Sequence, residues 1–397
     1  MTRRGPLTDL LVLDVTRVLA GPFAGMVLAD LGAEVIKIEM PGRGDDARAF
    51  GPFADGVSGY FASVNRGKKS LTLNLKASEG RDIFLELAAK ADVVLENYRP
   101  GVMKRLGLGY DRLRDRNPRL IYAACSGFGQ TGPYAHRPAY DAVIQATGGI
   151  MSLTGEEGGP PVRVGVSIAD IAAALCTVIG VLAALHQREN TGRGQMVDVA
   201  MLDCLVAILE NAIARHSITG AVPGRLGTRH PSITPFQAFD TADGQVVLAV
   251  GNDRLWREFC TLVGHPELAE DPRFATNHLR TRNHAQLQSL VADIMRAHPT
   301  DWWLEQLGAA SIPCGSINTI DRVVSDPQVI AREMIQTVVD PVAGLMQMAG
   351  VPIKLSDTPG GIAGPAPALG QHTDQVLRQH LGLDEPTIAR LRAAGVV

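Results

Sequence analysis

Residues 10–39, which read LLVLDVTRVLAGPFAGMVLADLGAEVIKIE, give the clearest indication of the fold. Leu10–Asp14 has the composition of a short buried strand, and Val35–Glu39 has the same character. Between them, Gly21-Pro22 opens a helical pattern that continues to Leu31. Two apolar strands joined by a helix are typical of a β-α-β unit in a parallel sheet. This stretch therefore predicts an α/β fold.

The alternation of strand and helix continues over the first two hundred residues. It predicts a large domain with a Rossmann-like parallel sheet. The further strands are expected over Ser70–Leu75, Val93–Glu96 and Leu120–Ser126, and the further helices over Arg81–Ala89, Ile168–His186 and Met201–Ala214.

The pattern of strand and helix signals changes near residue 215. Residues 219–224 form a loop or linker, and Phe236–Val250 holds Asp243-Gly244 between two β-type runs, which indicates a hairpin. Charged helical segments follow to about residue 307. We therefore expect a smaller α+β domain over residues 225–325. The large domain would comprise residues 1–215 and be completed by residues 330–397, where helices are expected over Asp374–Leu381 and Ile388–Ala394.

The composition of the 397 residues limits the class of protein. Hydrophobic residues make up 46% and charged residues 20%, which excludes a disordered or collagen-like chain. The formal net charge of −3 argues against a nucleic-acid partner but leaves room for a small anionic ligand. The five cysteines form no C-x-x-C pair and the ten histidines no H-x-H pair, so we expect no metal and a reducing, cytoplasmic location.

No segment has the pattern of a targeting signal or a membrane span. The residues after Met1 enter a strand-like run without the apolar core of a signal peptide. The longest apolar run, Ile171–Leu185, is shorter than the about 20 residues that a membrane helix needs. We therefore expect a buried helix there and no membrane partner.

Gly127–Gly132 fits the G-x-G-x-x-G pattern and follows a predicted strand. A dinucleotide site also needs a helix that begins inside the motif. Pro133 and Pro138 prevent such a helix here. We therefore expect a glycine-rich turn that lies close to a ligand, with a plain structural turn as the alternative.

Asp170 stands directly before the apolar run and is the main candidate for chemistry. One interpretation is a helix N-cap, with the carboxylate accepting backbone N–H groups. The other is a nucleophile, because an ionised carboxylate in an apolar setting is poorly solvated and reactive. The two interpretations are compatible in geometry, so position alone does not separate them.

Seven sequence blocks resemble the class III CoA-transferases, the CaiB–BaiF family, in the same order along nearly the whole chain. Each block is weak alone, but together they are specific. The blocks are Asp14–Pro22; Gly32–Glu39 with Pro41 and Gly44-Asp45; Asn65–Ser70; Glu96–Gly101; Gly127–Pro133; Thr191–Gln195; and Gly370–Thr373.

The resemblance implies a mechanism and a set of ligand contacts. An aspartate at the place of Asp170 would attack the thioester of an acyl-CoA and form a mixed anhydride. Coenzyme A would be a substrate, with no tightly bound cofactor, and the chain would form an interlocked homodimer. Met40 and Ser126 depart from residues that bind phosphate in relatives. The implied CoA contacts are Val18, Leu19, Leu73, Lys76, Asn97, Tyr98, Arg105, Arg137 and Tyr140.

Two other functions stay open. The same fold includes 2-methylacyl-CoA racemases, which pair the aspartate with a histidine just before an Asp. The matching pair here is Tyr140-Asp141, and a tyrosine with an ordinary pKa near 10 is a poor base. A non-catalytic CoA-ester-binding protein is the third possibility, which the intact Asp170 disfavours.

The acid acceptor is expected to be a dicarboxylate. Within the family the sequence is most similar to the succinyl-CoA:glutarate CoA-transferases, which implies succinyl-CoA as donor. Formyl-CoA transferases have a run of glycines where this chain has residues 227–233, and that departure argues against oxalate. We hypothesise that Arg229 or His230 binds the distal carboxylate of the acid. The alternative is an exposed loop arginine and a capping histidine.

Overall fold

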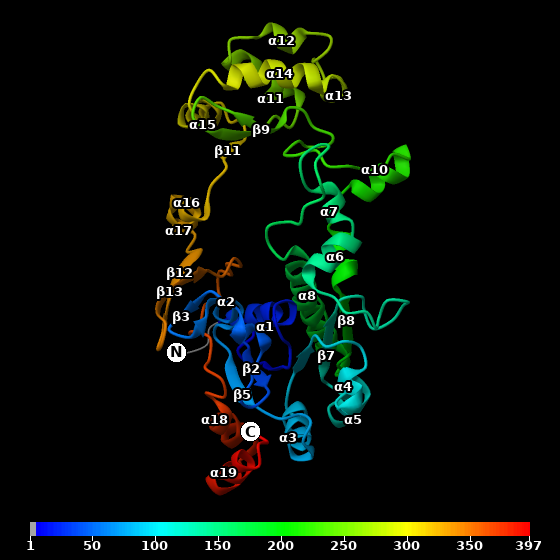
Figure 1. Cartoon of the computed structure of the whole chain (residues 1–397), viewed down its shortest axis with the longest axis vertical. Helices are drawn as coiled ribbons and strands as arrows, with labels where there is room; N and C mark the ends of the chain where they lie inside the picture. The colour runs from blue at the N-terminus through cyan, green and yellow to red at the C-terminus, as the bar shows by residue number, and fades with distance from the viewer. Residues whose placement is uncertain (1–4) are drawn as a thin grey trace. The chain divides into compact units, whose positions relative to one another are not determined.

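The computed structural model describes residues 5–397, which divide into two compact units (Figure 1). The larger unit takes the chain through Met151, residues 163–220 and residues 327–397. The smaller unit takes residues 152–162 and 221–326. Residues 152–162 thus lie in the smaller unit, whereas the sequence places them in the large domain.

The larger unit is built on a six-stranded sheet in which all pairings are parallel. This confirms the predicted Rossmann-like sheet. The strand order is β5-β2-β1-β6-β7-β8, so it reverses between β1 and β6. In open parallel sheets, ligands bind beyond the carboxyl ends of the strands at such a reversal. The strands are β1 (Leu11–Asp14), β2 (Glu34–Glu39), β5 (Lys69–Thr72), β6 (Val93–Glu96), β7 (Ile121–Ser126) and β8 (Met196–Ala200).

Helices cover both faces of this sheet, because successive residues of a strand point to opposite sides. On one side Leu11 and Leu13 pack with α3 (Ser78–Ala88), α5 (Tyr110–Arg116), α18 (Thr373–Leu381) and α19 (Glu385–Ala393). On the other side Val12 packs with α1 (Ala20–Asp30) and α8 (Ile168–Thr191), which lie beside each other in Figure 1. The strands are therefore buried from both sides, as the apolar runs predict.

The remaining elements of the larger unit are short. They are the 3₁₀ helix η1 (Asp46–Ala49), the hairpin of β3 (Phe53–Ala54) and β4 (Val57–Ser58), α2 (Gly59–Asn65), α4 (Val102–Arg105), α6 (Asp141–Thr147), α9 (Met201–Ala207), α10 (Ala212–Thr219), α17 (Pro327–Ala331), and the hairpin of β12 (Ile335–Asp340) and β13 (Gly344–Ala349). Helix α7 (Ile150–Leu153) spans the sequence boundary of the two units.

The smaller unit has a three-stranded antiparallel sheet packed with helices around an aromatic core. The predicted hairpin at Asp243-Gly244 is confirmed. Trp256, Phe259 and Trp303 are fully buried in the core. The elements are β9 (Phe236–Asp240), β10 (Gln245–Ala249), β11 (Cys314–Ser316), α11 (Asp253–Leu262), α12 (Glu267–Glu270), α13 (Asn277–Arg282), α14 (His284–Met295), α15 (Thr300–Ala309) and α16 (Ile320–Ser325).

One predicted helix is two helices in the structure. The expected helix over Met201–Ala214 is interrupted between α9 and α10. Glu210, in the interruption, has a φ of 55°, and a left-handed residue cannot continue a right-handed helix. The apolar periodicity on both sides of the break is preserved, so the sequence pattern did not reveal it.

Helix α8 is longer and less buried than its sequence predicts. Its 24 residues have the length and composition of a membrane span, although in this fold it packs against α1, β7 and β8. Leu175, Ile179 and Leu182 are 45%, 65% and 37% exposed. Their spacing of four and three residues places them on one face of the helix. The expected buried helix is therefore packed where it contacts α1, β7 and β8, and it is exposed on this one face.

Candidate active site

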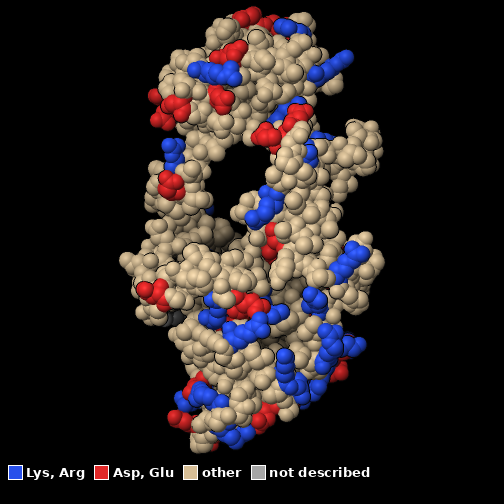
Figure 2. Space-filling view, viewed as in Figure 1, with Lys and Arg blue, Asp and Glu red and all other residues tan. Residues whose placement is uncertain are grey.

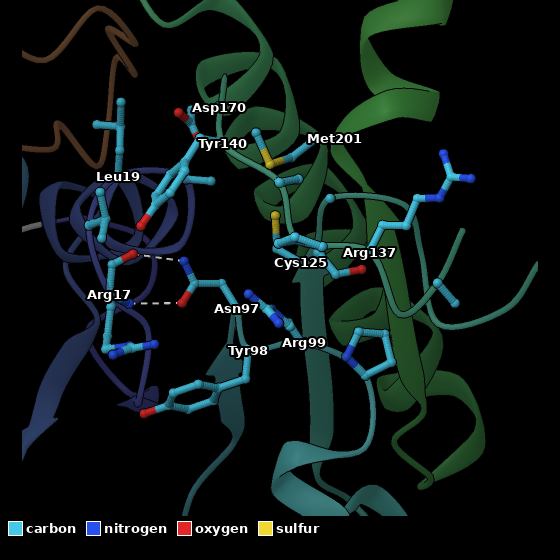
Figure 3. A pocket seen from close by; sticks show the side chains of 18 of the residues that line it. Arg17, Leu19, Asn97, Tyr98, Arg99, Cys125, Arg137, Tyr140, Asp170 and Met201 are labelled. Atoms are coloured by element: carbon cyan, nitrogen blue, oxygen red, sulfur yellow. Dashed lines mark hydrogen bonds between the residues drawn. The ribbon is translucent and has the colours of Figure 1, made fainter. Parts of the chain in front are cut away.

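The loops that follow β1, β6 and β7 line a cavity of about 210 Å³, at the reversal of strand order (Figure 3). The first residue of β6's loop, Asn97, and the β1 loop around Val18 face this cavity. Helix α8 contributes Asp170 to the lining. The site thus occupies the position that the sheet topology predicts.

Asp170 is the third residue of α8, so the N-cap interpretation is wrong. The N-cap position is Ser167, and its side chain makes no capping hydrogen bond. The carboxylate of Asp170 instead accepts the backbone N–H of Ala20, at the start of α1, and faces the cavity. Two helices from distant parts of the sequence therefore meet at this carboxylate.

Asp141 does the capping that the sequence assigned to Asp170. It is the first residue of α6, and its Oδ1 accepts the backbone N–H of Ala169 at 2.9 Å. Its Oδ2 accepts the side-chain amide of Gln145 at 2.7 Å, and the Gln145 Oε1 accepts the backbone N–H of Val164 at 2.8 Å. Asp141 is thus held rigidly next to Asp170.

The surroundings of Asp170 favour its neutral form. Burial, together with the negative charge of Asp141, outweighs the hydrogen bond from Ala20 and raises the pKa of Asp170 to about 7. Burial and the charge of Asp170 also raise the pKa of Tyr60 and that of the Cys125 thiol, the latter to about 12. At neutral pH the Asp170 carboxyl group is therefore partly ionised, and its ionised fraction is poorly solvated, which makes a carboxylate more reactive as a nucleophile.

Asn97 fixes the loop on the opposite side of the cavity. Its Oδ1 accepts the backbone N–H of Arg17 at 2.8 Å, and its Nδ2 donates to the carbonyl oxygen of Arg17 at 2.7 Å (Figure 3). The Arg17 guanidinium lies 5.1 Å from the centre of the Tyr98 ring. These contacts join the loops after β1 and β6.

A second cavity of about 270 Å³ adjoins the first, because Arg17, Asp46 and Tyr98 line both. Its wall is largely apolar and includes Leu73 and Met40, and Lys76 also lines it. The two cavities together offer an elongated space with one apolar part.

The structure brings together most of the residues that the sequence singled out. The first cavity is lined by Val18, Leu19, Asn97, Tyr98, Arg137, Tyr140 and Asp170, and the second by Leu73, Lys76 and Tyr98. Arg105 lines neither cavity; it is exposed at the end of α4. The glycine-rich turn also reaches the first cavity through Gly127, and no helix begins within it.

Arg229 and His230 lie in the smaller unit and are not among the residues that line these two cavities. The ring of His230 stacks on Phe236 with centres 5.2 Å apart, and its Nδ1 accepts the backbone N–H of Ser232 at 3.1 Å. The histidine thus has a local structural role, as its alternative interpretation expects.

The sequence did not identify Asp141 or Ala20 as parts of the site. Asp141 belonged to the pair compared with racemases, but nothing local indicated its contact with α8. Ala20 contributes only its backbone, which no sequence pattern distinguishes. Within residues 5–397, no three His, Cys, Asp or Glu side chains are grouped to hold a metal ion.

Positive charge surrounds the cavities. Arg17, Arg99 and Arg137 line the first cavity, and Arg43 and Lys76 line the second. Figure 2 shows Lys and Arg side chains gathered on the visible face of the larger unit. Asp46 and Asp170 also line the first cavity, and Glu39, Asp45 and Asp46 the second, and Arg17 and Arg43 both pair with Asp46. Arg99, Arg137 and Lys76 are therefore the cations best placed to meet an anionic ligand such as one that carries phosphates.

The fold and the site together define an α/β protein with a poorly solvated carboxylate, that of Asp170, beside an elongated cavity. A family model described as CoA-transferase family III matches residues 7–373, and the chain belongs to this family. Similar relatives include the acetyl-CoA:oxalate CoA-transferase of Acetobacter aceti, 46% identical over 89% of this chain and 90% of the relative. The human succinyl-CoA:glutarate CoA-transferase is 41% identical over 99% of this chain and 90% of the relative.

The fold is confirmed by a solved structure. A CaiB/BaiF family protein from Brucella suis is 40% identical, with a TM-score of 0.83 over 95% of this chain and 100% of that protein. The chain is therefore a CoA-transferase with the fold of class III, as its sequence blocks predict. A non-catalytic CoA-binding protein is no longer a competing interpretation.

Proposed function

We propose that the chain transfers CoA from succinyl-CoA to a free dicarboxylic acid, with Asp170 as the covalent nucleophile. A carboxylate oxygen of Asp170 attacks the thioester carbonyl, the C–S bond breaks, and CoA leaves as the thiolate. The product is a mixed anhydride between Asp170 and succinate. The thiolate then attacks the Asp170 carbonyl of the anhydride, which releases succinate and leaves an aspartyl-CoA thioester.

The second half of the reaction reverses these steps with the new acid. The acceptor carboxylate attacks the aspartyl-CoA thioester and displaces the thiolate, which forms a second anhydride. The thiolate then attacks the acceptor carbonyl, which gives the new acyl-CoA and regenerates the Asp170 carboxylate. No net proton transfer is required, so the site needs a nucleophile and hydrogen-bond donors but no general acid.

The observation that carries this proposal is the setting of the Asp170 carboxylate. It faces the cavity, it is largely shielded from water, and it accepts the backbone N–H of Ala20. That donor positions one oxygen and leaves the other towards the cavity. A structural carboxylate would have its charge matched by a cation, whereas the charged side chain that acts on the pKa of Asp170 is Asp141, with the same sign.

We propose that the CoA moiety lies along the two adjoining cavities. The thioester would be in the first cavity beside Asp170, and the rest of the molecule would extend past Tyr98 into the second. Leu73 offers apolar contact there, and Lys76 offers a charge for a phosphate. Arg137, whose guanidinium lies 3.7 Å from the centre of the Tyr134 ring, can meet a second phosphate.

The acceptor is proposed to be a dicarboxylate of four to six carbons. Relatives are named for glutarate and for oxalate, so the missing glycine run at residues 227–233 does not by itself exclude oxalate. We propose that Arg229 binds the distal carboxylate. If it does, Arg229→Ala raises the KM for glutarate at least tenfold, and an unchanged KM would remove this assignment.

The function is tested by intact-protein mass spectrometry after mixing with succinyl-CoA, followed by a panel of oxalate, succinate, malate, itaconate and glutarate. We expect a CoA adduct on the wild-type chain and CoA transfer to at least one acid, both lost in Asp170→Ala. Asp141→Asn is the matched control, because it removes a neighbouring carboxyl charge but keeps the nucleophile. Transfer that survives in Asp170→Ala would contradict the proposal, and isotope exchange at Cα of a 2-methylacyl-CoA without transfer would favour a racemase.

We also propose that the chain forms a homodimer through the exposed face of α8. Leu175, Ile179 and Leu182 form an apolar strip that soluble monomers rarely expose. Light scattering on the wild-type chain should give twice the chain mass, and Ile179→Glu should shift it towards the monomer. A wild-type monomer would contradict this proposal.

A further inference from the structure

Val18 has an unusual backbone conformation. Its φ of 68° is in the left-handed region, which a β-branched residue enters only when its surroundings hold it there. Val18 lines the first cavity, and two residues later the backbone N–H of Ala20 is donated to Asp170. The conformation of Val18 therefore sets the direction in which the start of α1 presents its N–H groups.

Asp45 supplies the contact that holds Val18. Its Oδ1 accepts the backbone N–H of Val18 at 3.0 Å and that of Ala47 at 2.9 Å. The side chain of Asp45 is 1% exposed, so water does not compete for these donors. Asp45 thus connects the loop after β1 to the 3₁₀ helix η1, which begins at Asp46.

Lys37, in β2, keeps Asp45 in place and in its charged form. Its Nζ lies 2.8 Å from Oδ2 of Asp45, and it donates to the carbonyl oxygen of Thr16 at 2.9 Å. Burial raises the pKa of Asp45, but the Lys37 ammonium and the N–H donors of Ala47 and Val18 outweigh it, so the net shift lowers that pKa. One fully buried lysine therefore restrains the loop on both sides of Arg17.

We propose that Asp45, paired with Lys37, is a positioning residue for the transfer reaction. It holds Val18 in the left-handed region and thereby keeps the N–H of Ala20 on the Asp170 carboxylate. This inference rests on the proposed role of Asp170 as nucleophile. In this inference the buried Lys37–Asp45 ion pair does not touch the reacting atoms. It orients the backbone N–H of Ala20, which does contact the Asp170 carboxylate.

The test is a double-mutant cycle that combines Asp45→Ala with Val18→Gly. Glycine adopts a positive φ without steric cost, so it does not need Asp45 to stay in that conformation. We expect Asp45→Ala to lower kcat/KM by about 5- to 100-fold when Val18 is present, which corresponds to the usual cost of a strained residue. In the Val18→Gly background the same substitution should cost much less.

A second readout separates positioning from a loss of stability. Without the Ala20 donor the pKa of Asp170 rises, so the acid limb of the kcat/KM profile should move to higher pH in Asp45→Ala. Asp141, Tyr60 and Cys125, the other titratable groups whose charges interact with that of Asp170, are unchanged in this variant. If Asp45→Ala does not fold, Asp45→Leu, which fills a similar volume and has no oxygen to accept the N–H of Val18, serves in both backgrounds with the same criteria.

The matched control is a second buried ion pair of the larger unit. Asp30, at the other end of α1, lies 2.6 Å from Arg66, and both side chains are almost fully buried. Asp30→Ala should lower the thermal stability but leave the acid limb in place and show no coupling to Val18→Gly. An equal loss from Asp45→Ala in both backgrounds, with an unmoved acid limb, would overturn the inference. Transfer that survives in Asp170→Ala would instead overturn the proposed function.

Discussion

The Asp141 carboxylate accepts the backbone N–H of Ala169 at 2.9 Å, one residue before Asp170 in α8. This contact explains how a second acidic side chain can stay beside Asp170. The helix-start N–H group compensates the charge of Asp141, and the two carboxylates remain close. The result is an Asp170 whose neutral form is favoured by burial and by Asp141.

The transfer rate should depend on pH through Asp170. Burial and Asp141 raise its pKa to about 7, and in the proposed mechanism only the ionised form attacks the thioester. We therefore expect kcat/KM for succinyl-CoA to fall on the acid side with an apparent pKa near 7. Glu96, whose pKa burial also raises to about 7, is the main competing group. Glu96→Gln should leave the acid limb of the kcat/KM profile in place. Loss of the acid limb in Glu96→Gln would contradict its assignment to Asp170.

Removing the charge of Asp141 should move the acid limb of the kcat/KM profile to lower pH. Loss of the Ala20 donor would move it to higher pH. In Asp141→Asn the amide oxygen can still accept the N–H of Ala169, but the repulsion on Asp170 is gone. The pKa of Asp170 then falls, and activity should persist to lower pH. A stopped-flow pH profile of the two proteins measures this shift. An unchanged limb would show that Asp141 does not act on the titrating group.

Asp170→Asn should stabilise the fold at alkaline pH while abolishing transfer. The pKa of Asp170 is raised from 3.8 to about 7, so between these values the folded state binds more protons and stability falls as pH rises. The variant should exceed wild type by on the order of 1 to 3 kcal/mol at about pH 8, and by less at about pH 5. Thermal unfolding at both pH values tests this, and a gap that does not grow with pH would be inconsistent with it.

Arg280→Lys should destabilise the smaller unit. The fully buried guanidinium donates to the carbonyl oxygens of Thr234 and Phe274 and to Asp253, at 2.7, 3.0 and 2.8 Å. A lysine cannot reproduce this fork, and we expect a loss of about 2 to 4 kcal/mol.

Tryptophan fluorescence reports on this unit alone, because the three tryptophans of the chain, Trp256, Trp302 and Trp303, all lie in it. The exposed Arg273, paired with Asp271 at 2.6 Å, provides the control, since Arg273→Lys should change stability by less than about 1 kcal/mol. Equal effects of the two substitutions on the free energy of unfolding would mean that the buried contacts of Arg280 stabilise the unit no more than an exposed ion pair does.

The sequence predicted the sheet well because buried parallel strands are local apolar runs. The expected strand over Val93–Glu96 coincides with β6, and the first helix ends within one residue of the prediction. The break at Glu210 was not predicted, because a residue other than glycine gives no sign in the sequence that its backbone is left-handed.

The candidate site was predicted less completely, for a physical reason. The family blocks identified Asp170, but its position just before an apolar run suggested a helix N-cap. In the structure the N–H of Ala169 at the start of α8 is instead accepted by Asp141, 29 positions before Asp170. The pairing of Lys37 with Asp45 was equally hidden, since charged residues in a strand and a loop reveal neither burial nor partner. Contacts between distant segments depend on the fold, which local patterns do not encode.

The most direct test of Asp170 as nucleophile follows the oxygen atoms. When the acceptor carboxylate carries ¹⁸O, each turnover through the anhydrides leaves one labelled oxygen in the Asp170 carboxylate. Trypsin releases the peptide from Val164 to Arg188, in which Asp170 is the only acidic residue. After turnover of succinyl-CoA with labelled glutarate, or with another acid that the panel identifies, we expect this peptide to gain one ¹⁸O atom, and up to two after repeated turnovers in which either Asp170 oxygen attacks. Transfer of CoA with no label in the peptide would contradict the mechanism.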